Sequence, residues 1–174
     1  MSTKLFPSLF AYKRWANREL FDLLKSVSHV ESADADKREN VMHTSIRLMN
    51  HIYVVDRIFQ AHLQGLPHDY EASNTKETPT LDTLALAVDE CDAWYESYVC
   101  DLDINTLQQE VSFVFTDGDT GRMTREEMLM HIITHGGYHR GNVGQLLKSI
   151  QVAPPRDIYT KFLHQLEPQR RQVS

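Results

Sequence analysis

Residues 124–150 read TREEMLMHIITHGGYHRGNVGQLLKSI. Thr124, with Glu127 three positions later, has the capping-box pattern that begins α-helices, in which the two residues bond reciprocally. Apolar residues then recur at intervals of three and four, which is the period of one helix face. The stretch therefore predicts a long amphipathic helix that ends at about Ile150, before Pro154-Pro155.

Two histidines lie inside the apolar stripe of this helix. At about 100° per residue, His139 falls about 40° from His135, and a polar ring in this position needs a partner. Residues four apart share a face, so both imidazoles can reach one metal ion. His131 and His135 are an equally well-spaced pair. Because His131 and His139 are about 12 Å apart along the axis, one ion cannot take all three, and spacing leaves both pairs open.

Working outward, three further segments repeat apolar residues with the helical period. They are Leu5 to about Ser28, a segment that begins near Asn40–Thr44 and ends at Gly65-Leu66-Pro67, and Thr80 to about Cys100. The polar stretches at 29–40 and up to Pro79 read as loops. A β-prone run followed by turn residues predicts a short hairpin near 111–123, and residues 156–166 predict a short C-terminal helix.

Four long amphipathic helices predict an all-α fold, a four-helix bundle with long inter-helix connections. The chain of 174 residues suits one domain covering 1–174. The connections above ten residues allow parallel neighbours, so the sequence does not fix the helix order.

The second of these helices carries another histidine among apolar neighbours, His51. A third imidazole from a facing helix would complete a three-nitrogen set, and three protein ligands plus water make the open, catalytic type of site. Nitrogen ligands suit Zn, Ni, Co, Cu or Fe and do not suit Mg or Ca. The alternative is that these are core histidines bonded to backbone carbonyls. The chain has no Glu-x-x-His and no His-Glu-x-x-His, which disfavours a di-iron bundle and a zincin protease.

The bulk composition excludes several classes of protein. The net charge is −6, and the one tight basic cluster is Arg170-Arg171, which argues against a nucleic-acid partner. No run approaches the ~20 apolar residues of a membrane span, and charges interrupt residues 1–24, which argues against a signal peptide. Cys91 and Cys100 on one helix are too far apart for a disulfide. We therefore expect a cytoplasmic protein without membrane or nucleic-acid partners.

The segment His135-Gly136-Gly137-Tyr138-His139-Arg140-Gly141 resembles the HRG motif of the DinB-like family of damage-inducible four-helix metalloenzymes. Further parts of the chain resemble that family in the same order. They are Tyr12-x-x-Trp15-Ala16-Asn17, Asn50-His51-Ile52 with Asp56, and Arg156-Asp157-Ile158-Tyr159. Asn142 departs from the glutamine that usually follows HRG, but it lies outside the ligand set.

The resemblance implies that His51, His135 and His139 hold one divalent metal ion per chain, zinc or nickel first, with iron, cobalt or manganese as further choices. His131 would then be a neighbour of the ligands. Tyr138, about 60° from His135 on the helix, could border the pocket, and Arg140, about 140° away, could bind an anion or form an inter-helix ion pair.

The resemblance also implies an activity and an assembly. Its better understood members are metal-dependent enzymes that use low-molecular-weight thiols, as S-transferases or an isomerase. The expected partners are a small-molecule thiol and a second copy of the chain, with Gly137, Gly141 and Gly144 on one face as a candidate dimer contact. The alternatives are a non-catalytic metal-binding stress protein and a DNA-interacting damage-response factor, the latter disfavoured by the charge.

Overall fold

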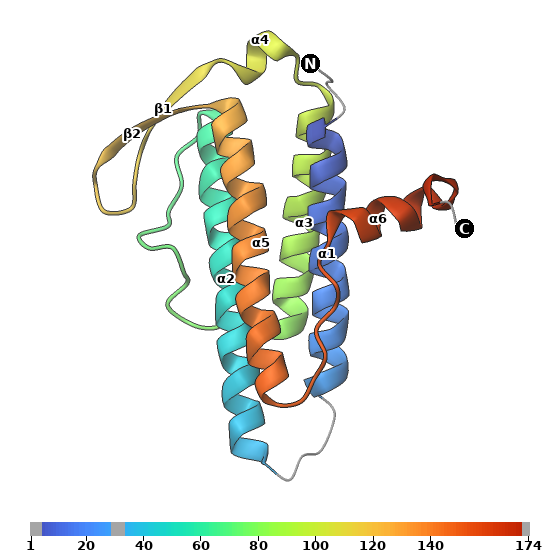
Figure 1. Cartoon of the computed structure of the whole chain (residues 1–174). Coiled ribbons are helices and arrows are strands. Elements are labelled where there is room, and N and C mark those ends of the chain that lie inside the picture. Colours follow the sequence, from blue (N-terminus) through green and yellow to red (C-terminus); the bar gives the residue numbers. More distant parts are fainter. Residues whose placement is uncertain (1–4, 29–33, 172–174) are drawn as a thin grey trace.

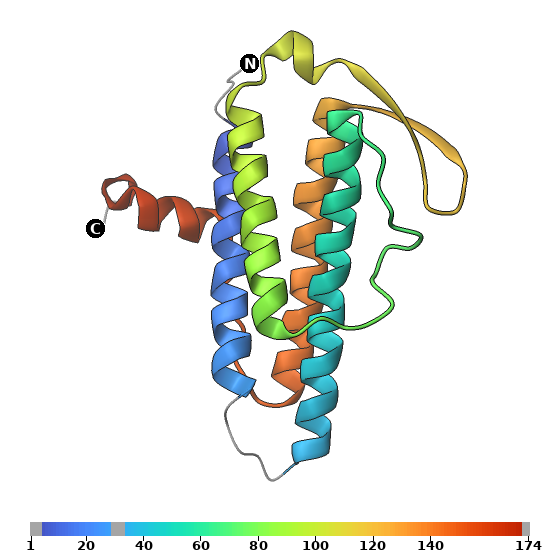
Figure 2. The ribbon, with the colours of Figure 1, turned by 180° about the vertical axis from the view of Figure 1, so that it is seen from behind.

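The computed structural model of the chain describes residues 5–28 and 34–171. Its frame consists of α1 (Leu5–Ser28), α2 (Ala35–Gln64), α3 (Leu81–Cys100) and α5 (Arg125–Ser149). Figures 1 and 2 show these four helices aligned as a bundle, in which α1 packs on α3 and α2 packs on α5. The predicted all-α bundle is therefore confirmed.

The connection between α2 and α3 sets the helix order. It runs back along the outside of α2 from one end of the bundle to the other, so α2 and α3 point the same way (Figure 2). The turn into this connection is made by Gly65, whose φ of 68° lies in the left-handed region that glycine adopts without a Cβ penalty. Thr80 then caps α3 by accepting a hydrogen bond from the Thr83 amide.

The start of α2 differs from the prediction. The helix begins at Ala35, with Asp34 as its N-cap, rather than near Asn40–Thr44. Residues 34–37 are exposed, so no apolar period marks the first turn and its polar composition resembles a loop. The rest of the predicted loop, residues 29–33, lies outside the described residues.

The predicted hairpin is confirmed as β1 (Glu110–Val114) and β2 (Thr120–Thr124), which pair antiparallel. The capping box of Thr124 and Glu127 begins α5, also as expected. A short helix that the sequence did not predict, α4 (Ile104–Leu107), precedes the hairpin. The C-terminal helix α6 (Tyr159–Leu166) begins three residues later than predicted, is followed by the 3-10 turn η1 (Pro168–Arg170), and projects from the bundle (Figure 1).

The bundle core has two apolar parts with a polar layer between them. One part contains Phe10 and Tyr95, and the other contains Leu24 and Met49. The layer between consists of buried polar side chains from all four long helices: Lys13, Asn17, Asp56, Asp92 and Arg140. No helix among the described residues is long and apolar enough to cross a membrane.

Candidate metal centre

Three histidines from two helices converge at the level of this polar layer. His51 comes from α2, and His135 and His139 come from successive turns of α5. One nitrogen from each ring lies within 4.8 Å of the other two, and no other group of three candidate ligands this close occurs among the described residues. The ring centres of the three pairs are 4.6–4.9 Å apart. The structure therefore brings together the three residues that the resemblance implies as ligands.

The cluster lies at the seam between α2 and α5 rather than in the middle of the core. All three rings are partly exposed, whereas Met49, Ile52 and Asp56 form the deeply buried side of α2. Because apolar residues flank His51 on both sides, the sequence predicted that its ring faces the core. Helix α2 in fact packs on both α3 and α5, so its buried face is wider than a single apolar stripe. One side of the cluster remains open to solvent as a result.

The surroundings of the rings fit a metal ion. The Nδ1 of His51 lies 2.7 Å from the carbonyl oxygen of Ser73, so Nδ1–H donates to it and Nε2 carries a lone pair. That Nε2 lies 3.0 Å from Nε2 of His135. Ligand atoms around a tetrahedral zinc ion are about 3.3 Å apart, which is close to this spacing.

The Nδ1 atoms of His135 and His139 are buried and have no hydrogen-bond partner among the described residues. Burial, followed by repulsion from the neighbouring imidazoles, lowers the pKa of His135 to about 3. Burial and the nearby His51 also lower the pKa of His139. Both rings are therefore neutral near pH 7, which is the form that ligates metals.

The other predicted site residues take different places. His131 stacks on His135 and on Phe59, with ring centres 5.3 and 4.7 Å apart, and stays outside the cluster. Tyr138 is 68% exposed and stands edge-on to His139 at 5.0 Å, at the border of the site. Arg140 does not face the cluster. It is buried behind it and pairs with Asp157 at 2.8 Å.

The α2–α3 connection contributes a part of the site that sequence reasoning missed. Besides the contact of Ser73 with His51, it is anchored on α2 where the Asn50 side chain donates to Asn74 and Thr75. Arg47 donates to the Thr75 carbonyl at 2.9 Å. A backbone carbonyl in a loop has no residue-type signal, so nothing in the sequence marks Ser73.

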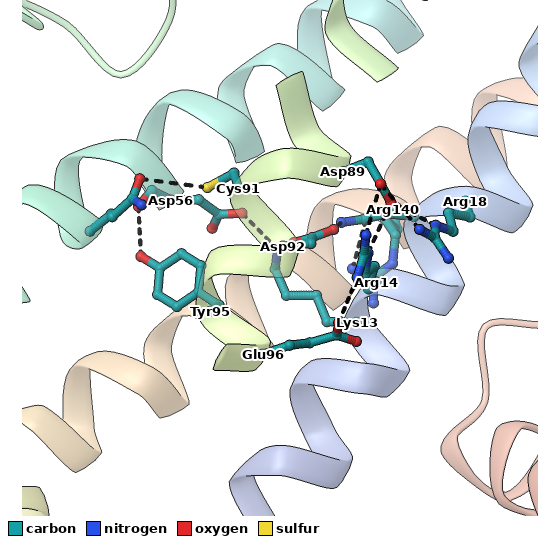
Figure 3. Close-up of polar contacts among 12 residues, drawn as sticks. Lys13, Arg14, Arg18, Asp56, Asp89, Cys91, Asp92, Tyr95, Glu96 and Arg140 are labelled. Carbon is teal, nitrogen blue, oxygen red and sulfur yellow. Dashed lines mark hydrogen bonds and ion pairs between the residues drawn. The ribbon is translucent and has the colours of Figure 1, made fainter. Parts of the chain in front are cut away.

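The polar layer behind the histidines was also missed. Lys13 of α1 donates to Asp56 of α2 at 2.7 Å and to Asp92 of α3, as Figure 3 shows around the labelled side chains. Asn17 donates to Asp92 and accepts from Arg140 of α5, which joins the fourth helix to the network. The sequence did contain a sign of this layer. Lys13 and Asn17 occupy core-facing positions of α1, within the buried series Phe6, Phe10, Leu20 and Leu24.

Lys13 also lies close to α5 at Gly136. A Cβ added to Gly136, the residue after His135, would lie 3.6 Å from Cε of Lys13 and 3.1 Å from a guanidinium nitrogen of Arg140. The glycine therefore lets α5 approach the polar layer closely. Burial alone would lower the pKa of Lys13, but the carboxylates of Asp56 and Asp92 outweigh it and raise the pKa.

Neither cysteine belongs to the site. Cys91 is buried in the core, Cys100 is exposed near the end of α3, and both are free, as predicted.

Part of the small-residue face of α5 is covered by the chain itself, because a Cβ on Gly144 would lie 3.4 Å from Pro154. Gly141 on the same face has no atom within 4 Å of such a Cβ.

Comparisons with known proteins agree with this architecture. A sequence model described as the DinB family matches residues 1–171. The chain is also similar to a protein named Protein DinB from Bacillus subtilis (strain 168), with 23% identity over 165 residues. That match covers 89% of this chain and 91% of the relative. Since the family match spans nearly the whole chain and includes all three converging histidines, the protein belongs to the DinB family.

Proposed function

We propose that this protein binds one divalent transition-metal ion, zinc or nickel, through His51, His135 and His139, and that it is an enzyme acting with a low-molecular-weight thiol. The observation that carries the proposal is the convergence of three imidazoles from two helices on one partly exposed point. Three protein ligands leave room for a substrate, as in catalytic rather than structural metal sites.

The residues of the chain have distinct parts in this proposal. A metal ion bound there would act as a Lewis acid and lower the pKa of a coordinated thiol. Ser73 fixes the orientation of the His51 ring, and burial keeps His135 unprotonated. Because Cys91 and Cys100 both lie outside the cluster, the sulfur has to come from a small molecule.

The reaction we propose is an S-transfer. The sulfur of the thiolate attacks an electrophilic carbon, a carbon–sulfur bond forms, and the leaving group departs with its bonding electron pair. The thiol proton passes to solvent. The open side of the cluster, bordered by Tyr138, is where the electrophile would approach.

Metal content tests the first part of the proposal. Protein purified without a nickel column should contain close to one metal ion per chain by mass spectrometry, and His139→Ala should lose it. His43→Ala is the matched control, because His43 is an exposed α2 histidine bonded to Thr78 outside the cluster. Absence of metal from wild type after reconstitution with zinc or nickel would refute the site.

Thiol consumption tests the second part. Metal-loaded protein is incubated with glutathione, bacillithiol or mycothiol and a panel of alkyl halides and epoxides, and the thioether product is measured by mass spectrometry. We expect product formation that His139→Ala abolishes and His43→Ala retains. Metal binding without product in any combination would contradict the enzymatic part and leave a non-catalytic metal-binding protein.

A further inference from the structure

A cavity lies near the C-terminal helix, away from the histidine cluster. It has a volume of about 650 Å³, and its walls come from α6, η1 and the residues that flank them. Figure 1 shows α6 beside α1, whereas the histidine cluster lies between α2 and α5. Small-molecule sites typically measure about 300–1,000 Å³, so the cavity has the size of one.

The lining of this cavity is basic. Arg156, Lys161, Arg171 and His164 line it, and no aspartate or glutamate is among its described lining residues. This composition is unusual in a chain that carries 24 acidic against 18 basic side chains. Cations gathered around one space repel each other, and an anion placed among them would relieve that repulsion.

Two of these cations are available for a ligand. Arg156 and Arg171 are exposed, and their side chains make no hydrogen bond or ion pair with any described residue. Lys161, in contrast, lies 3.4 Å from a Glu19 oxygen and 5.0 Å from the Trp15 ring centre, so it has protein partners. A guanidinium group presents a planar fork of N–H donors, which matches the oxygens of a phosphate or a carboxylate. The side chains of these two arginines can therefore bind such a group.

The wall of the cavity that α6 forms is held in place by the bundle. Phe162 of α6 is buried, with its ring centre 5.9 and 5.8 Å from those of Tyr12 and Trp15 of α1. The hydroxyls of Tyr159 and Ser8 are 2.7 Å apart and share a hydrogen bond. A preorganised wall loses less entropy when a ligand binds, which favours a specific site over a loose cluster of charges.

We propose that this cavity binds a small phosphate-bearing molecule, with Arg156 and Arg171 contacting the phosphate. Ile158 supplies an apolar wall for the body of the ligand, and Thr160 supplies a hydroxyl. The site is separate from the histidine cluster, so its occupancy does not depend on the metal ion.

Calorimetric titration with three probes at about 0.15 M salt tests the proposal: inorganic phosphate, glycerol 3-phosphate and adenosine monophosphate. We expect saturable binding of one organic phosphate per chain. Binding should weaken about tenfold or more in Arg156→Gln and in Arg171→Gln, because each removes a charge-assisted contact. Arg122→Gln, at an exposed hairpin arginine 3.3 Å from Glu110, should bind like wild type. So should His139→Ala, which separates this site from the metal centre.

Three results would overturn the proposal. One is the absence of saturable binding for every probe. Another is equal affinity in wild type and both cavity variants, with their folds verified by circular dichroism. The third is salt-sensitive retention of an oligonucleotide while the monophosphates fail to bind, which would assign the surface to a polyanion. Saturation by inorganic phosphate alone would also refute the part of the proposal that gives the ligand an organic body.

Discussion

Replacing Lys13 with methionine removes the cation between two buried carboxylates while keeping a side chain of similar length. The side chains of Lys13, Asp56 and Asp92 are only 1–2% exposed, so solvent screens their interaction little. One oxygen of Asp56 already lacks a partner, and the substitution would leave the other without one as well. Removal of one member of a buried ion pair costs about 3–5 kcal/mol, and we expect Lys13→Met to fall in that range.

Urea unfolding followed by circular dichroism measures this loss. With a slope of about 2 kcal/mol per molar urea, the midpoint should fall by about 1.5–2.5 M. Lys25→Met is the surface control, because Lys25 and its partner Asp82 are 39% and 82% exposed and such pairs contribute less than about 1 kcal/mol. If Lys13→Met lowers the midpoint no more than Lys25→Met, the buried network does not stabilise the bundle as argued.

A second variant covers the case in which Lys13→Met does not fold. The triple substitution Lys13→Met, Asp56→Leu and Asp92→Leu replaces the charges together and should recover much of the stability, because no unpaired charge remains buried.

The loss of stability in the single variant Lys13→Met should also depend on pH. Burial raises the pKa of Asp56 to about 6 against the lowering effect of Lys13, and without the lysine it should rise further. A raised carboxyl pKa means stability is lost as pH rises, so the deficit should be larger at about pH 8 than at about pH 5.

Three further predictions follow from other parts of the structure. Thr124→Ala removes the capping box with Glu127 and should cost about 1 kcal/mol in urea unfolding, whereas Thr134→Ala in mid-helix should cost less; equal losses would contradict the capping role. Hydrogen bonds from Arg14 and Arg18 lower the pKa of Asp89, so its contribution is complete above about pH 4 and lost as pH falls further. Lowering the pH should therefore destabilise wild type more than Asp89→Asn. If the stability of both proteins falls in parallel with pH, Asp89 does not make this contribution. Gly141→Leu, where an added Cβ meets no atom within 4 Å, should weaken the self-association expected from the family resemblance, as measured by sedimentation, while metal content stays constant; loss of metal with unchanged assembly would refute the interface.

Local signals in the sequence were enough for most of the fold. The capping box at Thr124 and the glycine stop at Gly65 each act within a few residues, so they can be read from the chain directly. The beginning of α2 could not be predicted, because its first turn is exposed and has no apolar period. The parallel course of α2 and α3 depends on where the connection packs, which is a tertiary property.

The candidate site was predictable in its residue types and not in its geometry. The spacing of α5 histidines could not choose between the pairs that contain His131 and His139, since both have the same period. Lys13 stood at core spacing in α1, whereas Asp56, about 140° from His51 on α2, fell on the polar side in the sequence; the partner of each is fixed only when the helices meet. The apolar neighbours of His51 also predicted too deep a position for its ring, because α2 packs on both α3 and α5 rather than on one partner.

The polar layer has a consequence for alternative alignments of the bundle. If α5 slid along α2 by one turn, about 5.4 Å, it would offer His131 and His135 to His51 in place of His135 and His139. Such a slip would also carry Arg140 away from Asn17 and bring a residue with a side chain toward Lys13, where Gly136 now fits. The misaligned arrangement would leave charges buried opposite hydrocarbon. The polar residues that divide the core therefore fix the position of α5 along α2. In doing so they select which of the two equivalently spaced histidine pairs faces His51.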